Sequence, residues 1–329
     1  MTARSLPLHV CSLLALTVLS FCAGCASKHE PVRIGINAWP GYEFLYLAQE
    51  KGFYRDEGLD VRLTEFGSLT DCRRAFERGQ IDVMGTTVVE VLLAREDSAS
   101  SPEIIQVVDY SDGADVILAH AGIVNGAGLR GVRIGVEQAS LGLYVLARGL
   151  EKNGLSLADV KVVPLDQVSM EDAFRRGEIA AVVTYPPTST KLLRHSSFKS
   201  VFSTSEIPGE VVDVIASSAT LSAERPGDVA KLIRAYHRAI AYTAQHPEDA
   251  YRIMAEREGI TPREFADALT DGLKLVAASE QAAYFEPGGK LQKVVDNTDR
   301  LLRQSELIKG PDRRAGVINA SHAAENKTP

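Results

Sequence analysis

The chain has 329 residues, of which 45% are hydrophobic and 24% charged, and its formal net charge is −7. This composition is typical of a globular protein of about two domains, and it excludes collagen, coiled coil and wholesale disorder. The acidic balance argues against nucleic-acid binding, and four cysteines are too few for a disulfide scaffold.

The N-terminal residues have the pattern of an export signal. A short apolar run at 10–21 ends in the sequence CAGC. Small residues before a cysteine resemble the lipobox of bacterial lipoproteins, in which that cysteine becomes the lipidated first residue. We therefore expect a lipoprotein signal peptide at 1–24, a lipid on Cys25 and a tether at 25–31; the alternative is a plain secretory signal. Ala26 favours anchoring in the outer membrane over the outer side of the inner membrane.

The body of the chain contains one internal repeat. The sequence VRIGI at 32–36 recurs as VRIGV at 132–136, and each copy has the pattern of a buried strand. Each is followed by a helix that ends at a glycine, and then by a second strand, at 59–63 and 160–163. A second helix and a third strand complete each copy. Alternating strands and helices predict parallel strands joined by crossover helices, and hence an α/β protein with two similar lobes.

The segments outside the repeat complete this organisation. Strand-rich stretches at 104–120 and 201–218 flank the second copy and are expected to cross between the lobes. Helices are predicted at about 226–258, from Pro262 to about 279, and at about 290–307. Ser169 with Asp172 and Thr261 with Glu264 predict capping boxes. The expected parts are a discontinuous first lobe (32–114 plus 209–307), a second lobe (115–208) and a disordered polar tail (310–329).

Polar and aromatic side chains gather where the predicted strands end, which is where open α/β sheets bind ligands. Trp39 and Tyr42 offer aromatic faces to apolar, planar or cationic groups, although Trp39 would also serve as ordinary packing. Hydroxyl groups at helix starts either bind ligand oxygens or cap the helix. Asp213 pairs either with a ligand amine or with a hinge backbone group. The candidate ligand-binding residues are Trp39, Tyr42, Glu43, Ser68, Thr86, Thr87, Tyr110, Ser111, Gln138, Ser140, Tyr185 and Asp213.

The charges in these strand-end loops are one-sided. The loops contain no Lys or Arg, but they hold Glu43, Asp71, Asp112, Asp115 and Glu137. An anionic ligand usually meets Arg or a helix N-terminus. This pattern favours a neutral, zwitterionic or amine-bearing ligand over nitrate or phosphate.

Other chemical motifs fail on inspection. The sequence GAGLRG at 126–131 precedes a predicted strand instead of following one, so it predicts a turn and not a dinucleotide site. There is no Walker A motif, and the seven histidines lack paired metal spacing. Once Cys25 is lipidated, Cys72 is the lone thiol of the mature chain and is expected to be a small core residue. We therefore expect no cofactor, no metal site and no catalytic residue.

Several blocks, in this order, carry a family resemblance: NAWPGYEFLYLAQEKGFY, SDGAD, VRIGVEQAS and PGEVVDVIASS. They resemble periplasmic solute-binding proteins of the nitrate, sulfonate, taurine and thiamine-precursor group, over about 32–307. The resemblance implies a type II periplasmic binding protein fold whose two lobes close around a small molecule. It also implies a monomer that delivers a taurine-like, sulfonate-like, amine-bearing or heteroaromatic solute to the permease and ATPase of an ABC importer.

Two other functions fit the same fold. A ligand-sensing lipoprotein that signals to a membrane receptor would have the same fold and the same cleft. A fungal pyrimidine synthase shares the fold family, but its cysteine-rich iron motif is missing here, which argues against an enzyme.

Overall fold

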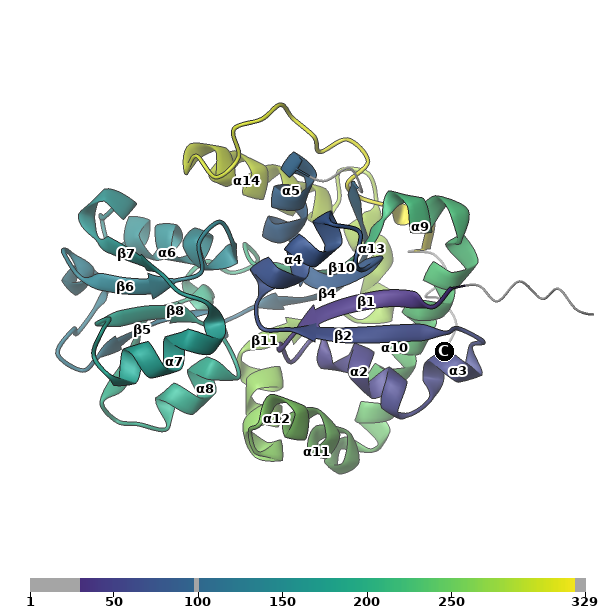
Figure 1. Ribbon diagram of the computed structural model, residues 1–329, viewed down its shortest axis with the longest axis horizontal. Helices are drawn as coiled ribbons and strands as arrows, with labels where there is room; N and C mark the ends of the chain where they lie inside the picture. The colour runs from purple at the N-terminus through teal and green to yellow at the C-terminus, as the bar shows by residue number, and fades with distance from the viewer. Residues whose placement is uncertain (1–29, 98–100, 323–329) are drawn as a thin grey trace, which may run out of the picture. The chain divides into compact units, whose positions relative to one another are not determined.

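Two mixed β-sheets flanked by helices make up the computed structural model, which describes residues 30–97 and 101–322 (Figure 1). The predicted signal peptide and the predicted lipidation of Cys25 lie outside the described residues. Both sheets belong to the compact unit that begins at Val32. Within the described ranges, no helix combines the length and the apolar character needed to cross a membrane.

The larger sheet has the strand order β11-β4-β10-β3-β1-β2. β1 is parallel to β2 and β3, whereas β10 is antiparallel to both of its neighbours, β3 and β4. Its strands are β1 (Val32–Asn37), β2 (Val61–Phe66), β3 (Val83–Thr87), β4 (Pro102–Ser111), β10 (Val212–Ser218) and β11 (Leu273–Leu275).

The smaller sheet has the strand order β7-β6-β8-β5-β9 and repeats this plan. β6 is parallel to β7 and β8, and β5 is antiparallel to β8 and β9. The order β7-β6-β8 therefore matches β2-β1-β3, and the antiparallel β5 beside β8 matches β10 beside β3. The predicted fold of two similar α/β lobes is confirmed. The strands are β5 (Val116–His120), β6 (Arg133–Val136), β7 (Lys161–Pro164), β8 (Ala181–Thr184) and β9 (Phe198–Ser203).

The glycine of the VRIGI motif and that of its repeat are required for the same reason in both lobes, namely the close approach of an isoleucine. A Cβ atom on Gly35 would lie 2.4 Å from Ile81 Cδ1, and one on Gly135 would lie 2.5 Å from Ile179 Cδ1. In each lobe an isoleucine just before the third strand thus packs directly on the backbone of the first strand. Only glycine leaves room for this approach.

Helices cover both faces of each sheet. In Figure 1, α4 and α5 lie on one side of the larger sheet and α2 and α10 on the other, while α6 lies across the smaller sheet from α7 and α8. The α-helices are α2 (Glu43–Glu50), α3 (Phe53–Asp56), α4 (Leu69–Glu77), α5 (Val88–Asp97), α6 (Leu141–Lys152), α7 (Gln167–Arg175), α8 (Thr188–Leu193), α9 (Ala219–Glu224), α10 (Pro226–Gln245), α11 (Pro247–Glu258), α12 (Pro262–Asp271), α13 (Gln281–Phe285) and α14 (Lys290–Gln304). The 3₁₀ helices are η1 (Gly126–Leu129), η2 (Leu157–Asp159), η3 (Thr204–Glu206), η4 (Ala278–Glu280) and η5 (Ala320–His322).

Some predicted boundaries are wrong. The helix predicted at 226–258 is two helices, because Pro247 has no N–H with which to continue α10. The helix predicted to reach 279 ends at Asp271, and the chain then adds β11 to the edge of the larger sheet. The capping box of Thr261 is present, but Ser169 is not a cap, because α7 already begins at Gln167.

The chain crosses between the lobes twice, once from β4 to β5 and once from β9 back to β10. The two crossings touch each other: Ser111 Oγ lies 2.6 Å from Thr204 Oγ1, and Gly113 N donates to the same Thr204 oxygen over 2.9 Å. Side-chain hydroxyls thus join the two crossings into one hinge region.

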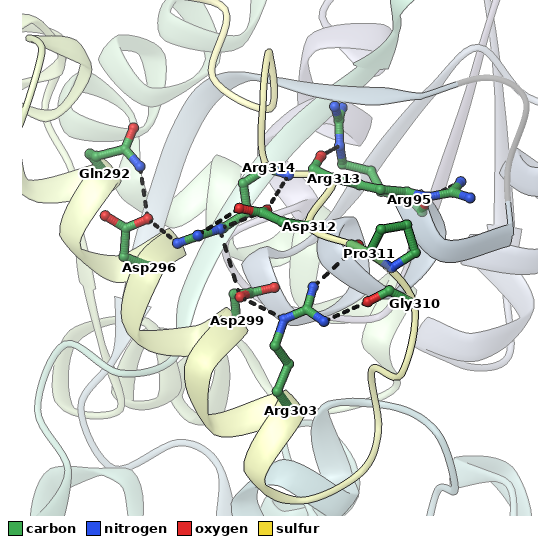
Figure 2. Close-up of polar contacts among 10 residues, drawn as sticks. All are labelled: Arg95, Gln292, Asp296, Asp299, Arg303, Gly310, Pro311, Asp312, Arg313 and Arg314. Atoms are coloured by element: carbon green, nitrogen blue, oxygen red, sulfur yellow. Dashed lines mark hydrogen bonds and ion pairs between the residues drawn. The ribbon is translucent and has the colours of Figure 1, made fainter.

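Residues 310–322 are not disordered, so the tail prediction is wrong for them. Ile318 forms a parallel bridge with Ile104 of β4, and Ile104 N donates to the carbonyl of the buried Val317 over 2.7 Å. Figure 2 shows the ion pairs that fasten this segment to α14, including Arg314 with Asp296 at 2.6 Å. We call residues 310–322 the C-terminal strap. Two apolar residues anchor it within a polar sequence.

Candidate functional site

A small cavity lies between the lobes at the ends of their strands. Its volume is about 10 Å³, which is about the room that one water molecule needs. The two lobes are therefore closed on each other, and an organic solute needs them to open or their side chains to move. The cavity is lined by Asn37, Trp39, Tyr42, Leu69, Thr87, Asp115, Leu141, Tyr185 and Asp213.

Three aromatic rings form one wall of this cavity. The Trp39 ring meets the Tyr185 ring edge to face at a centroid distance of 6.0 Å and lies 6.4 Å from the Tyr42 ring. Tyr185 comes from the second lobe, and its hydroxyl accepts from Asn37 Nδ2 over 3.4 Å. The wall is thus built from both lobes, and aromatic faces of this kind attract cations.

Three buried aspartates lie beside the aromatic wall. Trp39 Nε1 donates to Asp109 Oδ2 over 3.1 Å, and the Tyr42 hydroxyl donates to Asp213 Oδ1. One oxygen of each aspartate, including Asp115 Oδ2 and Asp213 Oδ2 at the cavity, has no hydrogen-bond partner. Within the described ranges, none of the three forms an ion pair with Lys, Arg or His. The cavity therefore has carboxylate acceptors to offer.

Strand register and a glycine turn place Asp109 beside Asp213 and Trp39. The register of β4 and β10 places Asp109 opposite Asp213. A Cβ atom on Gly41 would lie 2.0 Å from Asp109 Oδ2, so the turn after Trp39 can approach this carboxylate only with a glycine.

Burial changes the protonation of these acids. Loss of solvent raises the pKa of Asp115 to about 6, and the hydrogen bond from Ser111 opposes the shift. Burial also raises the pKa of Asp109, and burial with the neighbouring Asp109 and Asp115 raises the pKa of Asp213 well above its usual range. The facing carboxyl groups of Asp109 and Asp213 retain a proton because ionising both would place two like charges side by side in a buried site. A cation placed between them would reverse this shift.

The structure brings Trp39, Tyr42, Thr87, Tyr185 and Asp213 of the predicted set to the cavity. The candidate list did not include Asn37, Asp109 or Asp115, although Asp115 is one of the strand-end acids from which the sequence favours an amine-bearing ligand. Asp109 carried a usable signal, since it is a lone charge inside the apolar strand IIQVVDY.

The remaining predicted residues have other contacts. Ser68 caps α4 by accepting from Asp71 N over 3.1 Å, and Glu43 forms an ion pair with Arg257 at 2.5 Å. Burial, opposed by Arg257, raises the pKa of Glu43 to about 6. Thr86 is buried in β3 away from the cavity.

Four other predicted residues also lie off the cavity. Tyr110 lines a different surface hollow, and Ser111 belongs to the hinge. Gln138 is exposed, and the Ser140 hydroxyl donates to Glu90 over 2.6 Å.

A second cavity, of about 260 Å³, shares part of its lining with the first, and we call it the outer cavity. Asn37 and Tyr185 line both cavities. The outer cavity also contacts Gly67 of the first lobe, Val168 of the second, and the buried Glu258, whose two carboxylate oxygens have no hydrogen-bond partner. Among the residues that the structure describes, no group of three His, Cys, Asp or Glu side chains could hold a metal ion.

Residues 39–250 match the model of the NMT1/THI5-like family. The chain belongs to this family. A protein of Brucella abortus (strain 2308), named only as a suspected binding protein, is 27% identical over 316 residues, covering 88% of this chain and 95% of the relative. The riboflavin-binding protein RibY of Chloroflexus aurantiacus is 24% identical over 229 residues, covering 68% of this chain and 65% of RibY.

Solved structures of binding proteins share the two-lobed fold of this family member. The alkanesulfonate-binding protein SsuA of Xanthomonas axonopodis pv. citri, bound to MOPS, has a TM-score of 0.75 at 19% identity, covering 89% of this chain and 99% of that one. The nitrate-binding protein NrtA of Synechocystis has a TM-score of 0.71 at 12% identity, covering 91% and 88%. The desulfurization enzyme DSZB has the fold too, at a TM-score of 0.64 and 15% identity, covering 89% and 98%, so the fold alone does not separate binding from catalysis.

Proposed function

We propose that this protein is the solute-binding component of an ABC importer, and that it captures a small organic solute with a cationic, amine-type group by lobe closure. The single observation that carries the solute class is the set of unpaired carboxylate oxygens at a closed aromatic cavity. The membership of the family and the fold shared with SsuA and NrtA support the binding role.

The chemistry of the cavity fits a cation better than an anion. Asp213 Oδ2 and Asp115 Oδ2 are acceptors that lack donors, and an ammonium group has donors without acceptors. The rings of Trp39 and Tyr185 would enclose the apolar part of the solute and face its positive charge. A sulfonate or nitrate in the same place would lie against carboxylates with no cationic side chain in the cavity lining.

The burial of the Cys72 thiol agrees with a non-catalytic role. Cys72 is buried, and burial raises the pKa of its thiol, which keeps the sulfur protonated and unreactive. The predicted export signal supports a location: we propose a lipid-anchored monomer outside the cytoplasmic membrane that delivers its solute to a permease and ATPase.

The test is a titration of the form that lacks residues 1–25, followed by thermal shift and by the fluorescence of Trp39, the only tryptophan. The panel contains diamines, quaternary amines, amine-bearing heterocycles, taurine, ethanesulfonate and nitrate. We expect saturable emission changes and a raised melting temperature with one of the cationic solutes. Trp39→Phe is the control that must abolish the emission signal. Stabilisation by ethanesulfonate or nitrate, with none by the amines, would contradict the proposed solute class.

A further inference from the structure

Two helix N-termini face the cavity, one from each lobe. Leu69 and Leu141, the first residues of α4 and α6, both line it. The first turn of a helix has backbone N–H groups without partners, and it attracts negative charge. These two N-termini are therefore the places in the cavity where a negative group of a solute would bind.

The α4 N-terminus is already occupied. Thr70 N donates to Glu137 Oε1 over 2.8 Å, and Glu137 belongs to the loop after β6 in the opposite lobe. Glu137 is buried, with 6% of its surface exposed, so this contact is shielded from solvent. Burial and the neighbouring Glu90 raise the pKa of Glu137, while the bond from Thr70 lowers it.

A glutamate of the first lobe occupies the α6 N-terminus of the second lobe. Leu141 N and Ser140 Oγ donate to Glu90 Oε1 over 2.9 and 2.6 Å, and Glu90 belongs to α5 of the first lobe. The other oxygen of Glu90 accepts from Arg73 Nε over 2.6 Å.

Arg73 adds a third contact across the cleft, because its Nη2 donates to the carbonyl oxygen of Ala139 over 2.9 Å. Ala139 has a φ of 50°, a left-handed conformation that is strained for alanine.

We propose that Glu90 and Glu137 are built-in anions that set the charge specificity of the cavity. Each carboxylate occupies the helix N-terminus of the opposite lobe, which closes that position to a negative group of the solute and holds the two lobes together. This inference goes beyond the proposed function, because it concerns which solutes are excluded and what closes the protein before any solute binds.

Arg194 and Glu264 provide a matched comparison. They also form an ion pair between the lobes, at 2.7 Å, but on the exposed surface. Exposed ion pairs add little to stability, so loss of Arg194 should change little. Loss of Glu137 leaves the buried N–H of Thr70 without its acceptor.

The first experiment is chemical rescue of Glu137→Ala without any solute. We expect its melting temperature to fall by about 2–4 °C and to recover with added acetate or ethanesulfonate, but not with sodium chloride. The wild type and Arg194→Ala should respond to none of these anions. Equal responses of wild type and Glu137→Ala to acetate, or an unchanged melting temperature in the variant, would overturn the proposal.

A second experiment measures lobe closure, and it uses Glu137→Gln and Glu90→Gln in case the alanine variant does not fold. Spin labels on Asp60→Cys in the first lobe and Ser196→Cys in the second, both exposed positions, report the distance between the lobes. Each glutamine variant should add a population at longer distance that the Arg194→Ala control lacks. Distributions identical to the wild type would overturn the proposal. Both experiments are done on the solute-free protein, so their failure is distinguishable from failure of the cation assignment.

Discussion

At the scale of single residues, the three buried aspartates have opposing effects on folding and on binding. Asp109, Asp115 and Asp213 lose solvent without gaining a cationic partner, which raises their pKa values. A buried acid of this kind is more stable in its neutral form, so the folded protein loses stability when the aspartate ionises. A cationic solute would supply the missing partner. The pH range in which these acids are ionised is therefore the range in which the free protein is least stable and binds a cation most strongly.

Asp115 makes this relation measurable in the free protein. Its pKa of about 6 exceeds that of an unfolded aspartate, so the folded state holds its proton where the unfolded chain has lost it. Its contribution to stability is therefore complete at low pH and is lost as the pH rises between about 4 and 6. We expect Asp115→Asn to reduce the loss of unfolding free energy across this window, measured by urea denaturation at several pH values. An identical pH dependence in the wild type and the variant would contradict this assignment.

Asp213 should determine affinity. Asp213→Asn prevents this side chain from ionising beside a bound cation and so takes away a charge-assisted hydrogen bond, and we expect cation affinity to fall roughly 10- to 100-fold. Wild-type affinity should also fall as the pH drops below about 6, since Asp115 then gains a proton. Isothermal titration measures both effects. The control is Gln138→Ala, because Gln138 is exposed and lines neither cavity.

The sequence alone located part of this site. Trp39, Tyr42, Tyr185 and Asp213 were predicted because they follow or begin strands. Asp109 was missed, because its place beside Asp213 depends on the register of β4 against β10, two strands about 100 residues apart in sequence. Ser68 and Ser140 were predicted as ligand contacts, but a distant glutamate occupies each of their helix N-termini, which no local pattern reveals.

At the scale of elements, the internal repeat predicted the sheet plan well. Strand and helix periodicity was sufficient for β1, β2, β6 and β7, whose neighbours come from the same copy. β11 was read as helix because it has only three residues and pairs with β4, far away in sequence.

The repeated glycines give a prediction at this scale. Gly135→Ala would place a Cβ atom 2.5 Å from Ile179 Cδ1, so the core must shift. We expect a loss of about 1–3 kcal/mol of unfolding free energy in urea. Gly122→Ala is the matched control, because a Cβ atom there meets nothing within 4 Å. Equal stabilities of the two variants would show that strand β6 has more room than the structure gives it.

The C-terminal strap gives a second prediction at the scale of elements. Val317 is 2% exposed and is, with Ile318, one of the two apolar anchors of a segment that ion pairs also fasten to α14. Val317→Ala removes two buried methyl groups and should lower stability by about 1–2 kcal/mol. Ala315→Ser, at an exposed position of the same strap, should be neutral. Equal effects of the two changes would mean that the strap does not add to the core.

At the scale of the whole molecule, the two lobes meet through side chains rather than through a continuous sheet. Trp39 with Tyr185, Glu137 with Thr70 and Glu90 with Ser140 all cross the cleft. A cavity of about 10 Å³ between them leaves no space for an organic solute. Binding must therefore begin with separation of the lobes or with movement of these side chains.

A disulfide between the lobes tests this requirement. A Cβ atom on Gly67 would lie 3.5 Å from Val168 Cγ1, so the two side chains would touch across the lobes, and the double variant Gly67→Cys, Val168→Cys is the pair chosen to cross-link them. When oxidised, this variant should bind solute at least tenfold more slowly than when reduced, measured by stopped-flow Trp39 fluorescence. Gly67→Cys alone should respond to neither oxidant nor reductant. Unchanged binding in the oxidised double variant would mean that solutes reach the site without lobe separation.

The place of Tyr185 between the two cavities has a consequence for solute length. Tyr185 lines both an inner chamber about the size of a water molecule and an outer chamber of about 260 Å³. If movement of its ring joins the chambers, a long solute with the proposed amine at Asp213 would have its far end near Lys191, Arg257 and Glu258. For the solute class proposed above, movement of this one side chain would then decide which chain lengths fit.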